Sequence, residues 1–316
     1  MTVLITTPSF GAQSDRPWRA LEAAGLEARR PAASHPLSSA QLVAEVGDAT
    51  AVIVGLDTVD RSFFANAPGV RVVAKHGVGV DNIDLDAARE AGVRVVNAPG
   101  SNSGAVADLT WALMLALARK VVPAHRSMLE NRWDRFSGTE LAGRTLGVLG
   151  FGRIGQAVAR RAAGFDLHVV AYDPYVPDEV FAERGVRRVE FAEAVASADF
   201  LSLHLPGAPG AAALLGAAEL ATLPQGAFLV NAARGGLVDE DTLVTMLHDG
   251  RLGGAALDAF EHEPLPADSP LLTAPNVILT PHIGAFTDVA NAAMGEIAVE
   301  DVRRILNGEE PLNPVV

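Results

Sequence analysis

Three charged residues in the second half of the chain have side chains that could reduce a carbonyl group together. Arg234, Glu263 and His282 each come shortly after a run of apolar residues. An arginine can hold a carboxylate or a carbonyl oxygen bidentately. A histidine is the usual acid or base near neutral pH, and a carboxylate beside it favours its charged form. These residue types predict a set that binds an anion and transfers a proton.

A glycine-rich segment before these residues predicts a site for a dinucleotide. An apolar run ends in Gly150-x-Gly152-x-x-Gly155, and the next apolar run, Leu167–Tyr172, ends in Asp173. In such a motif the first glycine permits a tight turn and the second lets backbone N–H groups approach a pyrophosphate. The third lets the following helix pack closely on the strand.

The carboxylate of Asp173 predicts which dinucleotide binds. A carboxylate at the end of the second strand accepts hydrogen bonds from the ribose hydroxyls and repels a 2′-phosphate. The expected cofactor is therefore NAD rather than NADP. The N–H groups of Arg153 and Ile154, at the start of a helix expected to include the small-residue stretch Gln156–Ala163, would face its phosphates.

Alternating strands and helices must position these residues. In the first third of the chain we expect strands and helices at Val3–Thr6, Pro17–Ala24, Ala51–Val54, Val70–Lys75, Asp84–Ala91 and Val93–Asn97. A long helix is expected over Gly104–Met128. Six further strands are expected at Thr145–Leu149, Val169–Tyr172, Phe200–Leu203, Ala227–Asn231, Gly254–Leu257 and Val277–Thr280, followed by a helix over Asp288–Leu306. Strands that are apolar throughout predict parallel sheets covered by helices on both faces, which is an α/β fold.

In the second sheet, Arg234, Glu263 and His282 follow the last three strands. Ligands of open α/β sheets bind outside the carboxyl ends of the strands, so these side chains are expected to converge there.

Composition limits the classes of protein to consider. The 316 residues suffice for two domains, and 49% of them are hydrophobic. The net charge of −13 argues against nucleic acid or an anionic membrane as the partner. The N-terminus predicts a strand rather than a signal peptide, and Leu109–Ala118 is too short to span a bilayer, so the cytoplasm is expected. Cysteine is absent and no residue spacing suggests a metal site.

Several blocks of sequence resemble the NAD-dependent D-2-hydroxyacid dehydrogenases. Around the charged set these are Ala232–Asp239, Asp258–Pro264 and Pro281–Ala285. A fourth block, Gly77–Asp84, is similar to the substrate loop of the phosphoglycerate dehydrogenase branch of that family, in its short form. The blocks follow the family's order and spacing over nearly the whole chain.

The resemblance implies a role for each residue. His282 would give a proton to the carbonyl oxygen during hydride transfer, Glu263 would orient His282, and Arg234 would bind and polarise the substrate. The N–H groups of Val78 and Gly79 would receive the carboxylate of a small anionic substrate. Further residues implied in substrate binding are Lys75 and Gly77, and those implied in NAD binding are His204, Leu205, Pro206, Ala232, Asp258, His282 and Gly284.

The resemblance also implies an architecture of two doubly wound parallel-sheet domains. A Rossmann-type NAD-binding domain, residues 99–285, would be inserted in a smaller flavodoxin-like substrate domain made of residues 1–98 and 286–316. A homodimer would form through a helix and loop at about residues 104–140.

The chain departs from the phosphoglycerate branch at Val54-Gly55-Leu56, where that branch usually carries an Arg-Ser pair that meets the substrate phosphate. The expected substrate is therefore a small 2-hydroxy or 2-oxo acid. Two alternatives stay open: the same hydride chemistry on a phosphonate or phosphorus oxyacid, and an NAD(H)-sensing, corepressor-like interaction protein. We expect His35, His125 and His248 to be surface or capping residues rather than catalytic ones.

Overall fold

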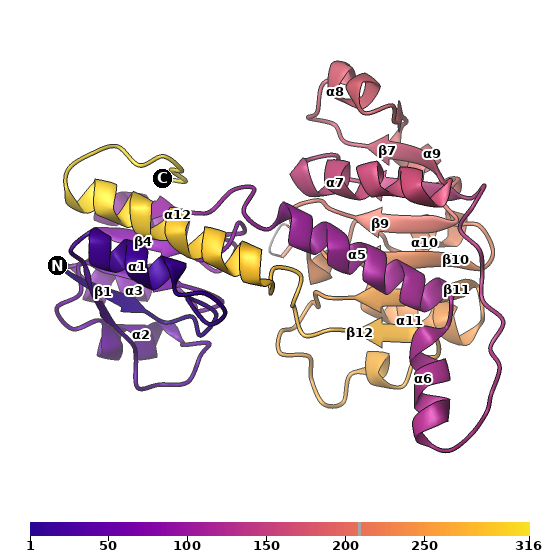
Figure 1. Cartoon of the computed structure of the whole chain (residues 1–316), viewed down its shortest axis with the longest axis horizontal. Coiled ribbons are helices and arrows are strands. Elements are labelled where there is room, and N and C mark those ends of the chain that lie inside the picture. The colour runs from indigo at the N-terminus through magenta and orange to yellow at the C-terminus, as the bar shows by residue number, and fades with distance from the viewer. Residues whose placement is uncertain (208–209) are drawn as a thin grey trace. The chain divides into compact units, whose positions relative to one another are not determined.

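A computed structural model describes residues 1–207 and 210–316 and divides the chain into two compact units (Figure 1). Unit 1 consists of Met1–Asn102 and Ala285–Val316, and unit 2 consists of Ser103–Gly284. The expected borders differ slightly, since the first unit ends at residue 102 rather than 98 and resumes at 285 rather than 286.

Unit 1 is built on a five-stranded parallel sheet. Its strands are β1 (Thr2–Ile5), β2 (Glu27–Arg29), β3 (Ala51–Val54), β4 (Val72–Lys75) and β5 (Arg94–Val96), in the order β2-β1-β3-β4-β5. This is the flavodoxin-like order. Every side chain of β3 and β4 is buried, as expected for strands covered on both faces.

The helices of unit 1 come from both ends of the chain. They are α1 (Arg16–Ala23), α2 (Ser39–Val46), α3 (Arg61–Asn66), α4 (Leu85–Ala91) and the C-terminal α12 (Asp288–Leu306). In Figure 1, α12 lies beside α1 and over β4. A Cβ built on Gly295 would lie 2.6 Å from Pro17 Cγ, so a glycine is what lets α12 pack so closely on α1.

Unit 2 holds a seven-stranded parallel sheet in the order β12-β11-β10-β9-β6-β7-β8. Its strands are β6 (Thr145–Leu149), β7 (His168–Tyr172), β8 (Arg187–Arg188), β9 (Phe200–Leu203), β10 (Ala227–Asn231), β11 (Leu252–Leu257) and β12 (Val277–Leu279). This is the dinucleotide-binding order with one added strand. The expectation of two doubly wound domains, one of Rossmann type and one flavodoxin-like, is confirmed.

Helices cover both faces of this second sheet. They are α5 (Ser103–Ala118), α6 (Val121–Leu129), α7 (Arg153–Ala162), α8 (Asp178–Glu183), α9 (Phe191–Ala196), α10 (Ala217–Thr222) and α11 (Glu240–His248), with 3-10 turns at Ala163–Phe165, Gly235–Leu237 and Pro270–Leu272. Figure 1 shows α5 and α7 side by side on one face. Trp111 and Met114 are buried there in the core. Of the described helices, none is long and apolar enough to cross a membrane.

Two expectations about unit 2 were wrong. The helix expected over Gly104–Met128 is two helices, because the chain turns at Lys120, which has a φ of 54° in the left-handed region. The sheet has seven strands rather than six, because β8 consists of two exposed arginines that carry no apolar signal.

Candidate active site

The glycine motif lies where the strand order of unit 2 reverses, between β6 and β9. Gly150 follows β6 with a φ of +92°, and a Cβ there would lie 2.6 Å from the carbonyl oxygen of His204, which follows β9. Gly155 is equally constrained, because its Cβ would lie 2.0 Å from the Gly150 oxygen. Two glycines are thus needed for the turn and for the approach of α7 to the strand.

Gly152 differs from the other two glycines in facing open space. It is the residue before α7, and a Cβ built on it meets nothing within 4 Å. No side chain of the described residues caps this helix, so the N–H groups of its first turn have no capping partner among them. Room and N–H donors at a helix N-terminus fit the pyrophosphate of a dinucleotide.

The Asp173 carboxylate helps to build this cofactor-binding loop. It is 8% exposed, and its Oδ2 accepts a hydrogen bond from the Phe151 N–H at 2.8 Å. Its Oδ1 accepts from the N–H groups of Tyr175 at 2.9 Å and Val176 at 3.2 Å. An ionised carboxylate has about four lone-pair positions, so one position, on Oδ2, is left for a ribose hydroxyl.

His204 lies on the other side of the glycine turn as a partly buried residue. Its Nε2 is 2.8 Å from the Ser202 hydroxyl, and burial lowers its pKa to about 3. It therefore carries no charge near neutral pH and cannot act as the acid. Leu205 and Pro206 continue from it along the carboxyl edge of the sheet, and their contact with the adenosine stays a prediction.

Arg234 and Glu263 are brought together by a backbone contact between two loops. A Cβ on Gly235, directly after Arg234, would lie 1.8 Å from the Phe260 carbonyl carbon, so only glycine fits there. The Arg234 backbone is extended, its carbonyl accepts a hydrogen bond from Asn231 Nδ2 at 2.7 Å, and its charge lowers the pKa of Glu263. The loops after β10 and β11 thus place the Arg234 charge close enough to Glu263 to lower the pKa of its carboxyl.

His282 is hydrogen-bonded to Glu263. Nδ1 of His282 is 2.8 Å from Oε2 of Glu263 and 3.0 Å from Oε1, which also accepts from the Phe260 N–H at 3.0 Å. Burial raises the pKa of Glu263, but the hydrogen bonds from His282 and Phe260 and the nearby positive charges outweigh it and keep this pKa below its usual value. An ionised carboxylate only accepts, so Nδ1 carries the proton and Nε2 is left for a substrate.

Asp258 holds the turn that carries His282. His282 has a φ of 52°, which is unfavourable for a residue with a side chain. The buried Asp258 accepts hydrogen bonds from the Thr280 hydroxyl at 2.6 Å, the Ile283 N–H at 2.8 Å and the Gly284 N–H at 2.8 Å. Burial is the main cause of its raised pKa. Nothing in the sequence indicated this role for Asp258, for which the resemblance implied contact with NAD.

The predicted substrate loop follows β4 in unit 1. The Val78 carbonyl accepts from Asn97 Nδ2 at 2.6 Å, and the Gly77 carbonyl accepts from the Ala98 N–H at 2.8 Å. The C=O and N–H of a trans peptide point in opposite directions, so the N–H groups of Val78 and Gly79 point away from β5. No described group accepts from either N–H, which leaves both available to a carboxylate.

The Lys75 ammonium is engaged within unit 1, and its contact with the substrate stays a prediction. Lys75 is 7% exposed, and its Nζ donates to the Gly55 carbonyl at 2.5 Å and to Asn82 Oδ1 at 2.6 Å. It fastens the loops after β3 and β4 to each other. Ala232 and Gly284 both lie at the carboxyl edge of the unit 2 sheet, near Arg234 and Asp258 respectively, and their contact with NAD stays a prediction.

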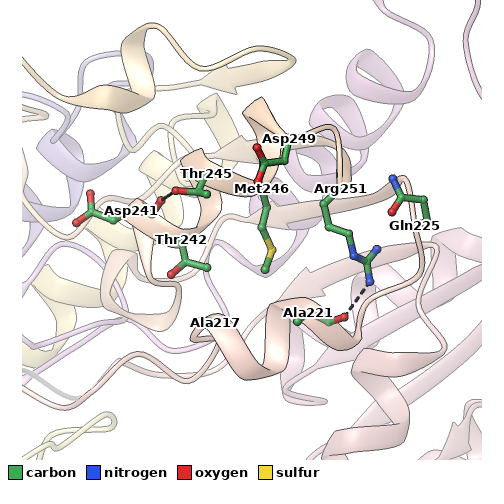
Figure 2. A pocket seen from close by; sticks show the side chains of 9 residues that line it. All are labelled: Ala217, Ala221, Gln225, Asp241, Thr242, Thr245, Met246, Asp249 and Arg251. Atoms are coloured by element: carbon green, nitrogen blue, oxygen red, sulfur yellow. Dashed lines mark hydrogen bonds between the residues drawn. The ribbon is translucent and has the colours of Figure 1, made fainter.

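A groove elsewhere on unit 2 is separate from these residues. It lies between α10 and α11 and is lined by Ala217, Ala221, Gln225, Asp241, Thr242, Thr245, Met246, Asp249 and Arg251 (Figure 2). Arg251 donates there to the Ala221 carbonyl at 2.8 Å, capping the end of α10. The groove contains none of the strand-end residues discussed above.

Comparison with known proteins agrees with this geometry. Residues 111–284 match the family described as D-isomer specific 2-hydroxyacid dehydrogenase, NAD binding domain. The D-3-phosphoglycerate dehydrogenase of Methanocaldococcus jannaschii is 45% identical over 283 residues, which are 88% of this chain and 54% of that protein. That of Mycobacterium leprae is 46% identical over 272 residues, 85% of this chain and 51% of that protein. The chain spans about half the length of these relatives.

Two solved structures match along their full length. The TT0316 protein from Thermus thermophilus has a TM-score of 0.88 and 39% identity, with 100% of each chain covered. The apo-structure of D-lactate dehydrogenase from Escherichia coli has a TM-score of 0.88 and 27% identity, again with 100% of each chain covered. Because the family match spans more than half of the residues and both units are found in solved relatives, this chain belongs to the D-isomer specific 2-hydroxyacid dehydrogenases, a family of NAD-dependent oxidoreductases.

Proposed function

We propose that this protein transfers a hydride between NAD(H) and C2 of a small 2-hydroxy or 2-oxo acid. The observation that carries the proposal is the His282–Glu263 pair at the carboxyl edge of the matched NAD-binding domain, where the charge of Arg234 also lowers the pKa of Glu263. These three side chains supply a proton donor, the carboxylate that orients it and a cation for the substrate.

The roles follow from the atoms that each residue leaves available. NADH, when bound, supplies the hydride that reduces C2. Nε2 of protonated His282 gives its proton to the carbonyl oxygen as negative charge develops there, and the Glu263 carboxylate stabilises the imidazolium before this transfer. Arg234 holds the substrate and polarises its carbonyl. In the opposite direction, neutral His282 accepts the hydroxyl proton.

The carboxylate of the substrate would be received by the backbone of unit 1. The N–H groups of Val78 and Gly79 point away from β5 with no acceptor among the described residues. Successive N–H groups of this kind form a concave site for an anion. In this part of the proposal Lys75, which donates to Gly55 and Asn82, holds the neighbouring loops in place.

A screen of 2-oxo acids tests the proposal, with NADH oxidation followed by its absorbance. We expect turnover with at least one small 2-oxo acid and none with the same acid lacking the 2-oxo group. Turnover of phosphonates alone would favour the first alternative, and NADH binding without turnover of any acid would favour a sensor.

The protein is further proposed to be a cytoplasmic homodimer, with α6 and the following residues as the interface. The segment leaves the sheet after Ala118 and returns to it, where the Thr139 N–H donates to the Ala118 carbonyl at 2.7 Å. Between these points Leu129 is 71% exposed and Trp133 is 74% exposed. Large exposed apolar side chains of this kind mark association surfaces.

Sedimentation tests the dimer, and cell fractionation tests the location. Wild type should sediment as a dimer, and Trp133→Glu should weaken it. The exposed Tyr175→Glu, on the cofactor-binding unit but far along the chain from α6, serves as the control. A monomeric wild type at micromolar concentration would contradict the proposal.

A further inference from the structure

The peptide group between Phe260 and Glu261 is held in two places by the segment that follows Arg234. A Cβ built on Gly235 would lie 1.8 Å from the carbonyl carbon of Phe260 and 2.2 Å from the nitrogen of Glu261, so this peptide lies directly against Gly235. The N–H of Glu261 donates to Oε1 of Glu240 at 2.8 Å. Gly235 and Glu240 belong to one continuous segment, and both contact the same peptide.

The position of Glu263 depends on this peptide through the one before it. The N–H of Phe260 donates to Oε1 of Glu263 at 3.0 Å, and Oε2 of Glu263 lies 2.8 Å from Nδ1 of His282. Consecutive N–H groups of the loop therefore donate to two different glutamates. Because adjacent peptide planes share one Cα atom, a displacement of the plane held by Glu240 also displaces the N–H that holds Glu263.

The loop after β11 leaves the core at this point. Phe260 is buried, whereas the next four residues, Glu261 to Pro264, are exposed. Segments with few buried apolar contacts change conformation most readily, so hydrogen bonds rather than packing must keep them in place. The hydrogen bond between Glu240 and the Glu261 N–H holds the loop at its first exposed residue.

Glu240 can hold the loop because its own backbone is fixed. It is the first residue of α11, and Asp239 before it caps this helix by accepting from the Thr242 N–H at 2.8 Å. The N–H of Asp239 in turn donates to the Leu215 carbonyl at 3.1 Å. The Glu240 carboxylate therefore extends toward the loop from an anchored helix start.

The charge of Glu240 is unfavourable in this environment. Burial is the main cause of its raised pKa, and the charges of Glu261 and Asp241 raise it further. The hydrogen bond from the Glu261 N–H and the charge of His262 lower this pKa, but they offset the other effects only in part. The oxygen that accepts from Glu261, rather than the negative charge, is thus what this side chain contributes.

We propose that Glu240 is a positioning residue for the proposed reaction, because its hydrogen bond to the Glu261 N–H keeps the loop after β11 in the conformation that pairs Glu263 with His282. A carboxylate beside a histidine favours the charged form of the ring. Loosening the loop should therefore let His282 lose its proton at a lower pH. The inference rests on the proposed function, since it takes His282 as the proton donor.

Two variants of Glu240 separate the hydrogen bond from the charge. Glu240→Asp keeps a carboxylate at the start of α11 but is one methylene shorter, which removes it from hydrogen-bond distance of the Glu261 N–H. Glu240→Gln loses the charge and keeps an acceptor oxygen. We expect Glu240→Asp to move the alkaline limb of the pH profile of kcat/KM, for reduction of a 2-oxo acid, down by about one pH unit. Its kcat/KM then falls about tenfold above the limb and little below it, whereas Glu240→Gln should keep the wild-type profile.

Asp241→Ala is the matched control for these variants. Asp241 is the next residue of α11 and is exposed, so its loss should leave the pH profile unchanged (Figure 2). A merely structural defect lowers kcat/KM at every pH and leaves the limb in place. Glu240→Ala takes the place of Glu240→Asp if the latter does not fold. Equal shifts in this variant and in Glu240→Gln, a shift in Glu240→Gln alone, or no shift in either would overturn the inference.

A second measurement makes the inference independent of turnover. The pH titration of the His282 ring protons by NMR, assigned with His282→Asn, follows the same protonation in the resting enzyme. Its midpoint should be lower in Glu240→Asp than in wild type and unchanged in Glu240→Gln. A wild type that reduces no 2-oxo acid would contradict the proposed function. In that case an unchanged midpoint in Glu240→Asp would still overturn the inference, and a lowered one would support it.

Discussion

Gly235 and Phe260 meet backbone to backbone, so closely that a Cβ on Gly235 would lie 1.8 Å from the Phe260 carbonyl carbon. The contact joins the loop of Arg234 to the loop of Glu263. Gly235, which takes no part in the proposed reaction, thus sets how closely the loops that carry Arg234 and Glu263 approach each other. The same approach could not be made by any residue with a side chain, because the obstacle is main chain that cannot rotate away.

Gly235→Ala is expected to separate these loops and to destabilise unit 2. An overlap with backbone cannot be relieved by a rotamer change, so the loss of unfolding free energy should be about 3 kcal/mol, the upper end of the range for overpacking, with activity lost at temperatures where the protein stays folded. Urea denaturation measures this. Gly236→Ala is the control, since its Cβ meets nothing within 4 Å; equal behaviour of the two variants would contradict the argument.

Replacing His282 should remove proton transfer and leave the cofactor bound. We expect kcat/KM to fall by about 10²–10⁴-fold, with the affinity for NADH measured by fluorescence titration changed much less. His282→Asn is the preferred variant because asparagine tolerates the left-handed backbone found here. His262→Ala, an exposed histidine in the preceding loop, should keep full activity. Normal turnover by His282→Asn would place the acid elsewhere.

Arg234→Lys should impair both binding and turnover of a 2-oxo acid. Lysine lacks the planar fork that holds a carboxylate or carbonyl in two hydrogen bonds, so KM should rise and kcat should fall by about tenfold or more each. Steady-state kinetics measure this, and NADH binding should be retained. The exposed Arg160→Lys on the same unit is the matched control. If the two lysine variants behave alike, Arg234 is not part of the site.

Asp173→Ala should narrow the preference for NAD over NADP and also cost stability. The carboxylate that would repel a 2′-phosphate accepts three backbone N–H groups in the same loop. Leaving them without an acceptor costs about 1–3 kcal/mol. The ratio of kcat/KM for the two cofactors and a urea curve measure the two effects. Asp178→Ala removes an exposed carboxylate nearby, and it should change neither the cofactor preference nor the stability. A wild type that prefers NADP would refute the assignment.

Two histidines with lowered pKa values should make the protein less stable in mild acid. Burial lowers the pKa of His76 in unit 1 to about 4 and that of His204 in unit 2 to about 3, both from 6.5. The unfolded chain therefore binds protons more tightly than the folded one. The stability contributed by each neutral ring is full above pH 6.5 and is lost as the pH falls toward the folded value.

At pH 5, each histidine should lower the free energy of unfolding of its unit by about 2 kcal/mol relative to pH 7.5. Urea denaturation at the two pH values measures the loss. In His204→Gln the pH-dependent loss for unit 2 should shrink, while that for unit 1 should persist. A loss of the same size in both units of the variant would show that other groups cause it.

The amino-acid sequence by itself determined the elements and their order. Apolar runs of strand length between helical segments can form a stable fold only as parallel sheets covered on both faces, and the spacing of Gly150, Gly152, Gly155 and Asp173 indicated the dinucleotide loop because each glycine meets a local requirement of the turn. The two short exposed strands, β2 and β8, carried no such signal, since they are held by a neighbouring strand rather than by their own side chains.

Only the tertiary structure decided what each polar side chain contacts. His35 was expected at the surface, yet it is held by the buried Asp57, and the Lys75 ammonium fastens two loops. Asp258 stabilises the turn of His282, and the pairing of His282 with Glu263 joins residues that follow different strands. Such partners lie on separate strand ends, so their contacts depend on strand order and on the close approach at Gly235. Neither the strand order nor this close approach can be predicted from the local sequence around any one of these residues.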